Sequence, residues 1–269
     1  MEELFPAEGP EIKVLCDYIR KDFLGKKIKN FYIYPDSRYR NGFNKEIPKD
    51  LDFIDIKSKG KYIYIQLSKD LYLYIEPRNS GKLKKIHEKG ASFKLESDEE
   101  LYFIDPLHYG QCFLFNKEEL DNKLSKVYWD SIDEDFDDKI NYFYENIKFN
   151  KPITLLVMTP KMFSSLGVCL KSETFYRAKI SPKTFGRDLS KEDLKRLLIA
   201  AKEKSLEVYK HNGCFDQKYS EDILIKSTFA DHADVFMKKT DKLGNRVKYM
   251  ITSIEKSCCF FVPEVQEIL

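Results

Sequence analysis

The sequence predicts an α+β protein: an N-terminal helix and an antiparallel β-sandwich, followed by a mainly helical domain that ends in a β-hairpin. Three observations support this fold class. Apolar residues in segment 10–24 recur at helical spacing, short segments between residues 29 and 115 alternate with a period of two, and helical periodicity returns after Ile153. With 269 residues, 42% of them hydrophobic, the chain suits two modest domains or one large one.

The first helix has a defined start and end. Gly9-Pro10-Glu11 places a proline and then an acid in the first turn, where both are favourable, and Gly25 follows the last apolar position. We therefore expect a helix over residues 10–24.

The strands that follow are short, rich in Ile, Tyr and Phe, and separated by turns that contain glycine. One helix followed by seven or eight such strands is typical of a β-sandwich that carries a helix. The expected strands are 29–34, 53–57, 61–67, 71–75, 91–95, 101–104 and 111–115.

The second half of the chain predicts helices and one hairpin. Residues 117–150 look helical and charge-rich, and we expect a linker at 126–150 between a first domain, 1–125, and a second, 151–269. Ser190 is a good N-cap for a helix that stops before Asn212-Gly213. The remaining expected elements are helices at 161–168, 169–179 and 216–234, and a hairpin at about 235–266 that turns at 241–245.

Composition narrows the possible functions only slightly. The 46 basic and 44 acidic residues give a net charge of +2, although segments 57–61 and 82–89 are basic and segment 130–138 is acidic. This distribution is compatible with nucleic-acid binding without requiring it. The six cysteines form no CxxC pair, the first residues lack the apolar core of a signal peptide, and no apolar run is long enough for a membrane span. We expect an intracellular protein with reduced thiols.

One helix pair suggests a way to bind phosphate. Segment 159–169, TPKMFSSLGVC, predicts a short helix and a tight turn at 164–168 before the next helix. Backbone N–H groups at such a turn and at a helix N-terminus suit a phosphate oxygen. Most helix pairs only pack, so this segment is weak support for DNA binding by itself.

Five segments in order resemble the formamidopyrimidine-DNA glycosylase / endonuclease VIII (Fpg/Nei) family. GPEIKVLCDYIRKDFLGKKI is similar to its first helix, KSKGKYIYIQL to its lysine-bearing hairpin, and FIDPLHYGQCFLF to its DPRRFG segment. ITLLVMTPKMFSSLGVCLKSETFYRAKISP resembles its helix-two-turn-helix, and KKTDKLGNRVKYMITSIEKSCCFFVPEVQ its C-terminal finger in the zincless version. The resemblance covers nearly the whole chain, so it implies the family's fold.

The resemblance implies a protein that removes oxidised bases from DNA and then cuts the strand. In the family, an N-terminal proline nitrogen, freed by loss of the initiator Met, attacks C1′ and forms a Schiff base. The next Glu assists proton transfer. A hairpin Lys, a turn Asn and a finger Arg hold the phosphates around the flipped nucleotide.

The catalytic N-terminus departs from the family pattern. The family's EGPE is intact as Glu8-Gly9-Pro10-Glu11, but Ala7 stands at the nucleophile position and six residues precede it. A nitrogen inside a peptide bond has a delocalised lone pair, so Ala7 needs cleavage after Pro6 to become a nucleophile. Glu8 and Glu11 remain candidate catalytic carboxylates or simple helix N-terminal acids. A second alignment places MEEL on the family's MPEL. It puts Glu2 at the nucleophile position and Glu3 at the position of the acid, but it displaces the helix start.

Two DNA-binding positions of the family are partly kept. Lys61 matches the hairpin lysine, which grips a phosphate or helps to protonate the sugar. In the turn, Val168 replaces the phosphate-binding Asn and has no side-chain donor, which leaves the backbone N–H groups of Gly167 and Val168 as candidates. Glu173 and Tyr176 lie where the second helix packs, and we expect them to be structural.

The finger and the void-filling positions depart further. Ser257 aligns with the finger arginine, and Lys256 is its candidate substitute. Adjacent Cys258 and Cys259 cannot ligate zinc from two knuckles, so we expect no metal and no cofactor. The positions that fill the hole left by the flipped base are Asn79, Leu107 and Tyr109, of which Tyr109 can still act as a wedge. The four histidines show no ligand spacing.

The sequence therefore leaves two functions open. One is a DNA glycosylase with AP-lyase chemistry whose nucleophile is altered or processed. The other is a DNA-binding or structural paralogue that keeps the fold and has lost catalysis. In both cases the expected partner is DNA, damaged or abasic, and we expect a monomer without a membrane anchor. The Lys-, Ile-, Asn- and Tyr-rich composition is typical of an AT-rich genome, such as that of a large DNA virus.

Overall fold

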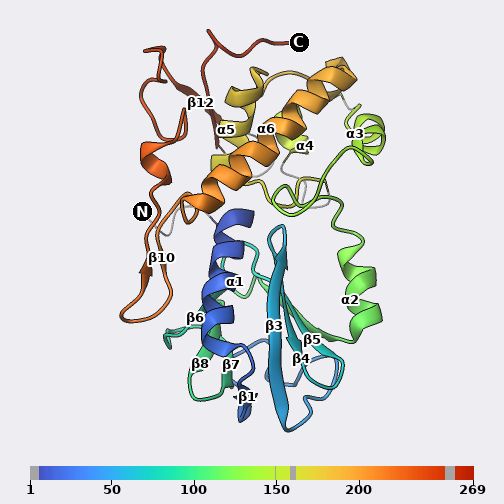
Figure 1. Ribbon diagram of the computed structural model, residues 1–269, viewed down its shortest axis with the longest axis vertical. Helices are drawn as coiled ribbons and strands as arrows, with labels where there is room; N and C mark the ends of the chain where they lie inside the picture. Colours follow the sequence, from blue (N-terminus) through green and yellow to red (C-terminus); the bar gives the residue numbers. More distant parts are fainter. Residues whose placement is uncertain (1–5, 149, 158–161, 252–257) are drawn as a thin grey trace. The chain divides into compact units, whose positions relative to one another are not determined.

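The computed structural model describes residues 6–148, 150–157, 162–251 and 258–269 (Figure 1). Its contacts divide the chain into two compact units, and neither unit is one continuous stretch. Unit 1 contains residues 11–126 and 215–226 together with the residues up to Ala7, and unit 2 contains residues 8–10, 127–214 and 227–269. This division differs from the expected one, which placed a linker at 126–150.

Unit 1 is built on helix α1 (Gly9–Phe23), of which the first two residues cluster with unit 2. Ile19 and Phe23 are fully buried, and the Phe23 ring lies 5.7 Å from that of Phe53. Gly25 follows with a φ of +75°, a left-handed conformation that favours glycine. The predicted first helix is confirmed.

Two antiparallel sheets form most of the remainder of unit 1 (Figure 1). Each predicted strand is present, and the sandwich is confirmed, because alternate Ile, Leu and Phe side chains turn inward to bury a common core. The five-stranded sheet has the order β1 (Lys27–Ile28), β3 (Leu51–Lys59), β4 (Tyr62–Leu67), β5 (Leu71–Glu76) and β9 (Gln111–Phe115). The four-stranded sheet has the order β2 (Asn30–Ile33), β7 (Ala91–Glu96), β8 (Glu100–Ile104) and β6 (Lys82–Lys84).

Helix α2 (Lys117–Leu124) starts with a capping box between Asn116 and Glu119 and packs Leu120 on the tyrosines of β5. Later in the chain, β10 (Gln217–Lys218) and β11 (Leu224–Ile225) form a hairpin that belongs to the same unit.

The helix expected at 216–234 is therefore wrong. The main chain and side chain of Tyr219 explain why, because both have partners in the sandwich. The carbonyl oxygen of Tyr219 accepts from the N–H of Lys85 at 2.8 Å, and its hydroxyl donates to Asp22 at 2.9 Å. These long-range bonds favour an extended chain. Only one turn of 3₁₀-helix, η2 (Phe229–Asp231), follows.

Unit 2 is centred on α5 (Val168–Ala178) and α6 (Lys191–Lys210), and strand β13 (Cys258–Phe261) packs on α5. A capping box between Ser190 and Asp193 starts α6, which confirms that predicted start. Its other elements are α3 (Ile140–Asn146), the single turn α4 (Ile153–Leu156), η1 (Gly186–Asp188), and the antiparallel pair β12 (Lys248–Ile251) and β13 (Cys258–Phe261).

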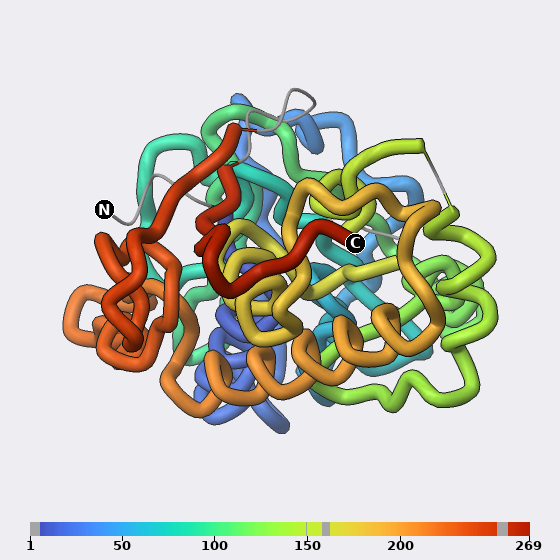
Figure 2. The backbone as a smooth tube through the Cα atoms, turned by 90° about the horizontal axis from the view of Figure 1, so that it is seen from above, coloured from blue at the N-terminus to red at the C-terminus, as the bar shows by residue number. Residues whose placement is uncertain are grey.

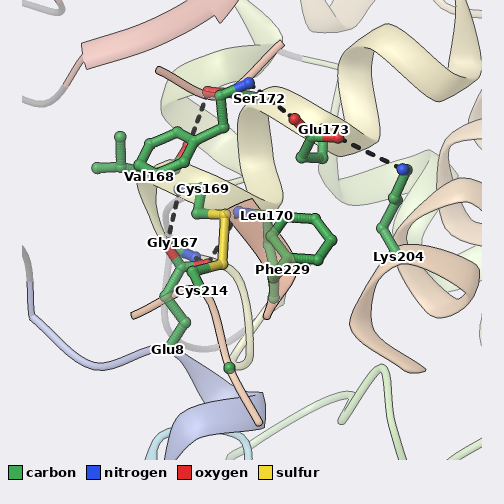
Figure 3. The surroundings of a disulfide bond; sticks show 12 residues. Glu8, Gly167, Val168, Cys169, Leu170, Ser172, Glu173, Lys204, Cys214 and Phe229 are labelled. Carbon is green, nitrogen blue, oxygen red and sulfur yellow. Dashed lines mark hydrogen bonds and ion pairs between the residues drawn. A yellow bond between two sulfur atoms is a disulfide. The ribbon is translucent and has the colours of Figure 1, made fainter. Parts of the chain in front are cut away.

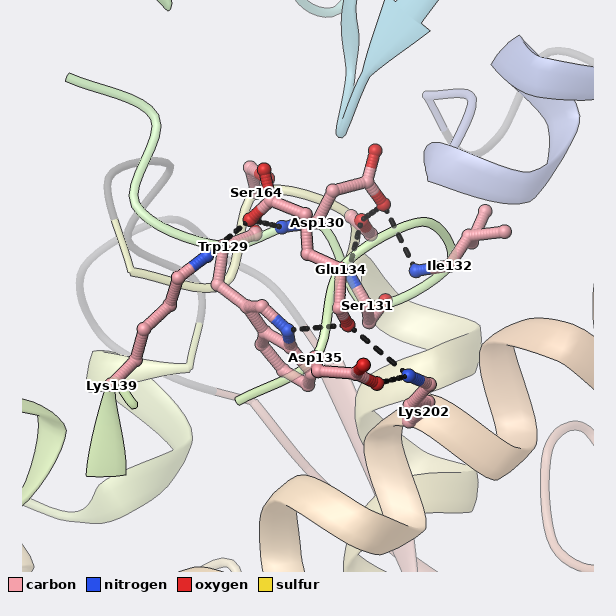
Figure 4. Close-up of polar contacts among 10 residues, drawn as sticks. Trp129, Asp130, Ser131, Ile132, Glu134, Asp135, Lys139, Ser164 and Lys202 are labelled. Carbon is pink, nitrogen blue, oxygen red and sulfur yellow. Dashed lines mark hydrogen bonds and ion pairs between the residues drawn. The ribbon is translucent and has the colours of Figure 1, made fainter. Parts of the chain in front are cut away.

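Three expectations for unit 2 need correction. The described part of 161–168 consists of turns rather than a helix, and 235–239 is not a strand. The acidic segment 127–139 has no helix and is not a loose connection, because Trp129 is fully buried and its indole N–H donates to the carbonyl of Glu134 at 3.2 Å (Figure 4). Apolar contacts of one aromatic side chain thus override the charged composition.

The end of the chain is also tied into unit 2. The N–H of Ser181 donates to the carbonyl of Glu267 at 2.7 Å, and Figure 2 shows the C-terminal segment passing along the residues that follow α5. Among the residues that the structure describes, none of the helices has the length and apolar character that crossing a bilayer demands.

Candidate nucleic-acid interface

The turn before α5 does not offer an empty anion site, because Glu8 fills it (Figure 3). The buried Glu8 carboxylate accepts from the backbone N–H groups of Gly167 at 2.9 Å, Cys169 at 2.7 Å and Leu170 at 3.0 Å. These N–H groups would otherwise lack partners at a helix N-terminus. A charge-bearing side chain from the other end of the sequence therefore caps the helix.

Glycine is required at position 167 by this cap. A Cβ atom there would lie 2.5 Å from the Cδ atom of Glu8, which is well inside any allowed contact. Gly9 is crowded in the same way, since its Cβ would lie 2.6 Å from that of Ser165, whose carbonyl accepts from the N–H of Gly9 at 2.8 Å. The two glycines let the N-terminal segment approach the turn closely.

The cap changes the expected roles of three residues. The N–H of Gly167, an expected phosphate donor, is bonded to Glu8 in this structure. Val168 is buried and offers no side-chain donor. Glu8 itself is held in place by three N–H donors, which makes it the cap of α5.

A disulfide joins Cys169, in the first turn of α5, to Cys214, which follows α6 (Figure 3). The expectation that the thiols are all reduced is therefore wrong for this pair, whose 45-residue separation gave no sign of proximity. The remaining four cysteines are free. No group of three or more His, Cys, Asp or Glu suited to a metal ion occurs within the described ranges.

Further along α5, the expected structural roles of Glu173 and Tyr176 fit the contacts. Glu173 is fully buried and accepts from the N–H groups of Val235 at 2.9 Å and Phe236 at 2.8 Å. The Tyr176 hydroxyl donates to Asp241 at 3.0 Å, and burial together with this bond raises the pKa of Tyr176 to about 12. Both side chains therefore fix the segment that leads to β12.

A buried lysine completes that network. Lys204 of α6 lies 2.5 Å from Asp234 and 3.4 Å from Glu173. Burial alone lowers the pKa of Lys204, but the carboxylates outweigh it and the net pKa is raised. Burial alone raises the pKa of Asp234, but its ion pairs with Lys204 and Lys242 hold the net pKa below the usual value. The pairs compensate the cost of burying the charges.

In unit 1, Ala7 and Glu11 line the same pocket. Its other walls come from α1, β4, the segment around Gly81 and the start of the β10–β11 hairpin. Glu11 is buried, and the side-chain amide of Gln217 donates to its main-chain carbonyl at 3.2 Å. The pocket thus brings together the two expected positions with residues 215–218, a wall that sequence patterns missed.

The other expected residues of unit 1 lie outside this pocket lining. Lys61 is half-buried in the turn between β3 and β4, where Gly60 has a φ of +58°. Leu107 and Tyr109 are 59% and 54% exposed on the loop between β8 and β9, and Asn79 is exposed as well. The finger candidates, Lys256 and Ser257, lie outside the described residues.

These features define a class of two-unit α+β proteins, in which a helix-headed β-sandwich is combined with a capped helix-two-turn-helix and a C-terminal hairpin. A family model, the formamidopyrimidine-DNA glycosylase N-terminal domain, matches residues 7–112. The formamidopyrimidine-DNA glycosylase of Mycoplasma pneumoniae is 27% identical over 197 residues, covering 68% of this chain and 70% of that protein. Its namesake from Wolbachia pipientis is 26% identical over 212 residues, covering 72% and 75%.

Solved structures are similar over nearly the whole chain. The MutM (Fpg) protein of Thermus thermophilus has a TM-score of 0.83 at 19% identity, covering 97% of this chain and 99% of that one. Lactococcus lactis Fpg in complex with abasic-site DNA has a TM-score of 0.80 at 20% identity, with the same coverage. Residues 7–112 thus match the N-terminal domain of the formamidopyrimidine-DNA glycosylases, and the chain as a whole has the fold of the solved Fpg proteins.

Proposed function

We propose that this protein binds DNA and recognises oxidised-base or abasic sites, and that its glycosylase and lyase chemistry requires a free amine at Ala7. The observation that carries the proposal is the pocket shared by Ala7 and Glu11. The family match supports the register, because it begins at residue 7. The relatives are named formamidopyrimidine-DNA glycosylases, and one solved relative holds abasic-site DNA.

The chemistry follows from the amine. A terminal amine at Ala7 attacks C1′, the bond to the damaged base breaks with its electron pair on the base, and a nearby acid supplies the proton. The sugar ring then opens as the C1′–O4′ bond breaks and O4′ takes up a proton, which leaves a Schiff base between C1′ and the Ala7 nitrogen. Loss of a C2′ proton from this Schiff base eliminates the 3′ phosphate. With residues 1–6 attached, the same nitrogen is an amide and cannot react in this way.

The two carboxylates take different roles in this proposal. Glu8 accepts three backbone N–H bonds at the start of α5, so its proposed role is to position the N-terminal segment. Glu11 lines the pocket and is the proposed proton carrier. Lys61 and Tyr109 are the proposed DNA contacts of unit 1, and Lys256 and Ser257 remain proposed contacts of the finger.

Borohydride trapping on an abasic-site oligonucleotide tests the enzyme. We expect no adduct with the full-length chain and a covalent adduct with a protein that starts at Ala7. The matched control is the trimmed protein with one glycine added before Ala7. It keeps a terminal amine but moves it one residue away from the Ala7 position. An adduct of the full-length chain at another residue would contradict the role of Ala7. Intact mass of the protein from its native source shows which N-terminus exists.

A second function, a DNA-binding paralogue without catalysis, is favoured by one observation. Glu8 accepts from the N–H groups of Gly167, Cys169 and Leu170, and Val168 has no side-chain donor, so fewer donors at the start of α5 remain for a phosphate. If neither protein form is trapped while both bind duplex DNA at ~50 mM salt, this function is the correct one. As part of the proposal, the protein acts as a monomer inside the cell; elution as a dimer in size-exclusion chromatography would contradict the monomer.

A further inference from the structure

The loop between β8 and β9, residues 105–110, exposes two large apolar side chains at a fixed place. Leu107 is 59% and Tyr109 54% exposed, whereas Asp105 at the base of the loop is fully buried. An exposed apolar pair on a flexible loop would lose much conformational entropy on insertion into DNA. The contacts of this loop indicate that residues 105–110 are already ordered in the protein without DNA.

The inner side of the loop is closed by Asp105. Its carboxylate accepts from the N–H of Gly110 at 2.9 Å and from the hydroxyl of Ser80. Gly110 also lies on the ring of Phe103, since a Cβ there would be 2.8 Å from the ring edge. The end of the loop therefore cannot shift without breaking buried contacts.

The outer side of the loop is held by Arg38, which comes from a turn about seventy residues earlier in the sequence. One guanidinium nitrogen, Nη1, donates to the carbonyl of His108 at 3.0 Å and to the carbonyl of Gly110 at 2.8 Å. These two carbonyls flank Tyr109 on both sides. A single side chain thus bridges the backbone that presents the Tyr109 ring.

The chain segment that carries Arg38 packs into the same aromatic core as the loop. The neighbouring Tyr39 ring is buried and stacks on Phe43 at 4.9 Å. Phe43 contacts Phe93 at 5.6 Å, and Phe93 stacks on Phe103 at 5.2 Å, the ring beneath Gly110. Because both ends of the bridge rest on packed rings, Arg38 is positioned before any ligand binds.

The bridge also accounts for an unusual backbone angle. His108 has a φ of +55°, in the left-handed region that is unfavourable for residues with a side chain. Such a conformation persists where surrounding contacts determine it. The hydrogen bond from Arg38 to the His108 carbonyl is one of those contacts, and the N–H of His108 donates to the Asp105 carbonyl at 3.1 Å.

We propose that Arg38 is the positioning residue of a preordered wedge, in which it holds Tyr109 ready to fill the space left by an unstacked nucleotide. This inference rests on the proposed recognition of damaged DNA and adds a residue to it. Insertion of a side chain between bases is favourable only if the energy of unstacking is offset. A wedge that is ordered in the free protein loses less entropy on insertion.

The test compares Arg38→Met with Arg40→Met, its matched control. Both variants remove one exposed positive charge from the same turn, but only Arg38 bridges the loop. The first readout is the ratio of affinities for duplexes with and without a tetrahydrofuran abasic-site analogue. The second is amide hydrogen exchange of residues 105–110 in the protein without DNA. Tyr109→Ala and the double variant Arg38→Met/Tyr109→Ala complete a cycle.

We expect Arg38→Met to lower the affinity ratio about tenfold and to accelerate exchange in the loop, while Arg40→Met changes neither. Tyr109→Ala should lower the ratio to a similar extent, and the double variant should lose no more than the larger single loss. An unchanged ratio and unchanged exchange in Arg38→Met, or additive losses in the double variant, would overturn the inference.

The two readouts separate this inference from the function on which it rests. If the wild-type protein shows no preference for the abasic analogue, the proposed recognition fails and the wedge role falls with it. Exchange in the free protein still decides whether Arg38 fixes the loop. A melting temperature of Arg38→Met close to that of Arg40→Met shows that any lost preference is not general unfolding.

Discussion

At the scale of single residues, the Glu8 side chain has two candidate roles, one in catalysis and one in stabilising the fold. A terminal catalytic carboxylate and a helix cap require the same residue type, and the sequence alone left both roles open. In the structure the carboxylate is buried and accepts three N–H bonds at the start of α5. Removing it leaves those donors without partners in a buried place, which is costly.

We therefore predict that Glu8→Ala destabilises unit 2 by about 2–4 kcal/mol, and that Glu8→Gln costs less because one oxygen acceptor remains. Urea unfolding at pH 7 measures both. The matched control is Glu118→Ala, an exposed acid in the first turn of α2, which should change stability by less than about 0.5 kcal/mol. Equal stability of Glu8→Ala and the wild-type protein would exclude the cap.

Asp234 gives a prediction about pH. Its pKa is lowered in the folded protein, so its contribution is complete above the unfolded value of about 3.9 and is lost as pH falls through the lower folded value. The pKa of Lys204 is raised, so its contribution is complete below about 10.4 and is lost at higher pH.

The variant Asp234→Asn isolates the acid side of this dependence. It should cost about 2 kcal/mol at pH 7, because it removes the nearest carboxylate partner of the buried Lys204 and leaves Glu173 and Glu207. The difference from wild type should begin to shrink below about pH 3.9, where the carboxylate of the unfolded chain takes up a proton, and should disappear as pH falls through the lower pKa of the folded protein. Urea unfolding from pH 3 to 7 measures the difference, with exposed Asp222→Asn as control. A difference that stays constant with pH would show that the ion pairs are not its source.

At the scale of elements, the disulfide links the start of α5 to the end of α6. The two helices also pack along their length, so the bond closes a loop around an existing contact. Its stabilisation comes mainly from restricting the unfolded chain, and the 45-residue separation corresponds to about 3–4 kcal/mol.

We predict that the double variant Cys169→Ser/Cys214→Ser loses about that much stability, and that a dithiol reductant has the same effect on the wild-type protein. Thermal unfolding with and without the reductant measures it. The reductant should leave the double variant unchanged, which controls for its effect on other cysteines. Alkylation of Cys169 in unreduced, denatured protein would show that the bond does not form.

At the scale of the whole molecule, the units are interleaved in sequence. Unit 1 needs residues 215–226, which supply Tyr219, a fully buried side chain bonded to Asp22. A cut between residues 126 and 127 therefore removes part of the first core rather than separating two independent domains.

We predict that a fragment of residues 1–126 unfolds less cooperatively than the intact chain and gains stability when a peptide of residues 215–226 is added. Circular dichroism melts measure both effects. A peptide in which Tyr219 is replaced by alanine is the control, and it should give no gain. A fragment that melts as sharply as unit 1 in the intact chain would show that the hairpin is dispensable.

The sequence by itself determined the parts that depend on local periodicity. Alternation of apolar residues places β3, β4 and β5, and the cap at Ser190 starts α6, because these signals act over a few residues. The order of the motifs also predicted the similarity to formamidopyrimidine-DNA glycosylases. The departures at Ala7 and Val168 were visible in the sequence, since they compare residue types at aligned positions.

Only the tertiary structure decided which distant groups meet. The Glu8 cap, the Cys169–Cys214 bond and the bridge from Arg38 to the Tyr109 loop join residues 45 to about 160 positions apart, and no local pattern encodes such pairs. The hairpin at Tyr219 replaced a predicted helix for the same reason, because partners in the sandwich outweighed local preference. Backbone N–H groups and buried charges need partners, and folding brings those partners from anywhere in the chain.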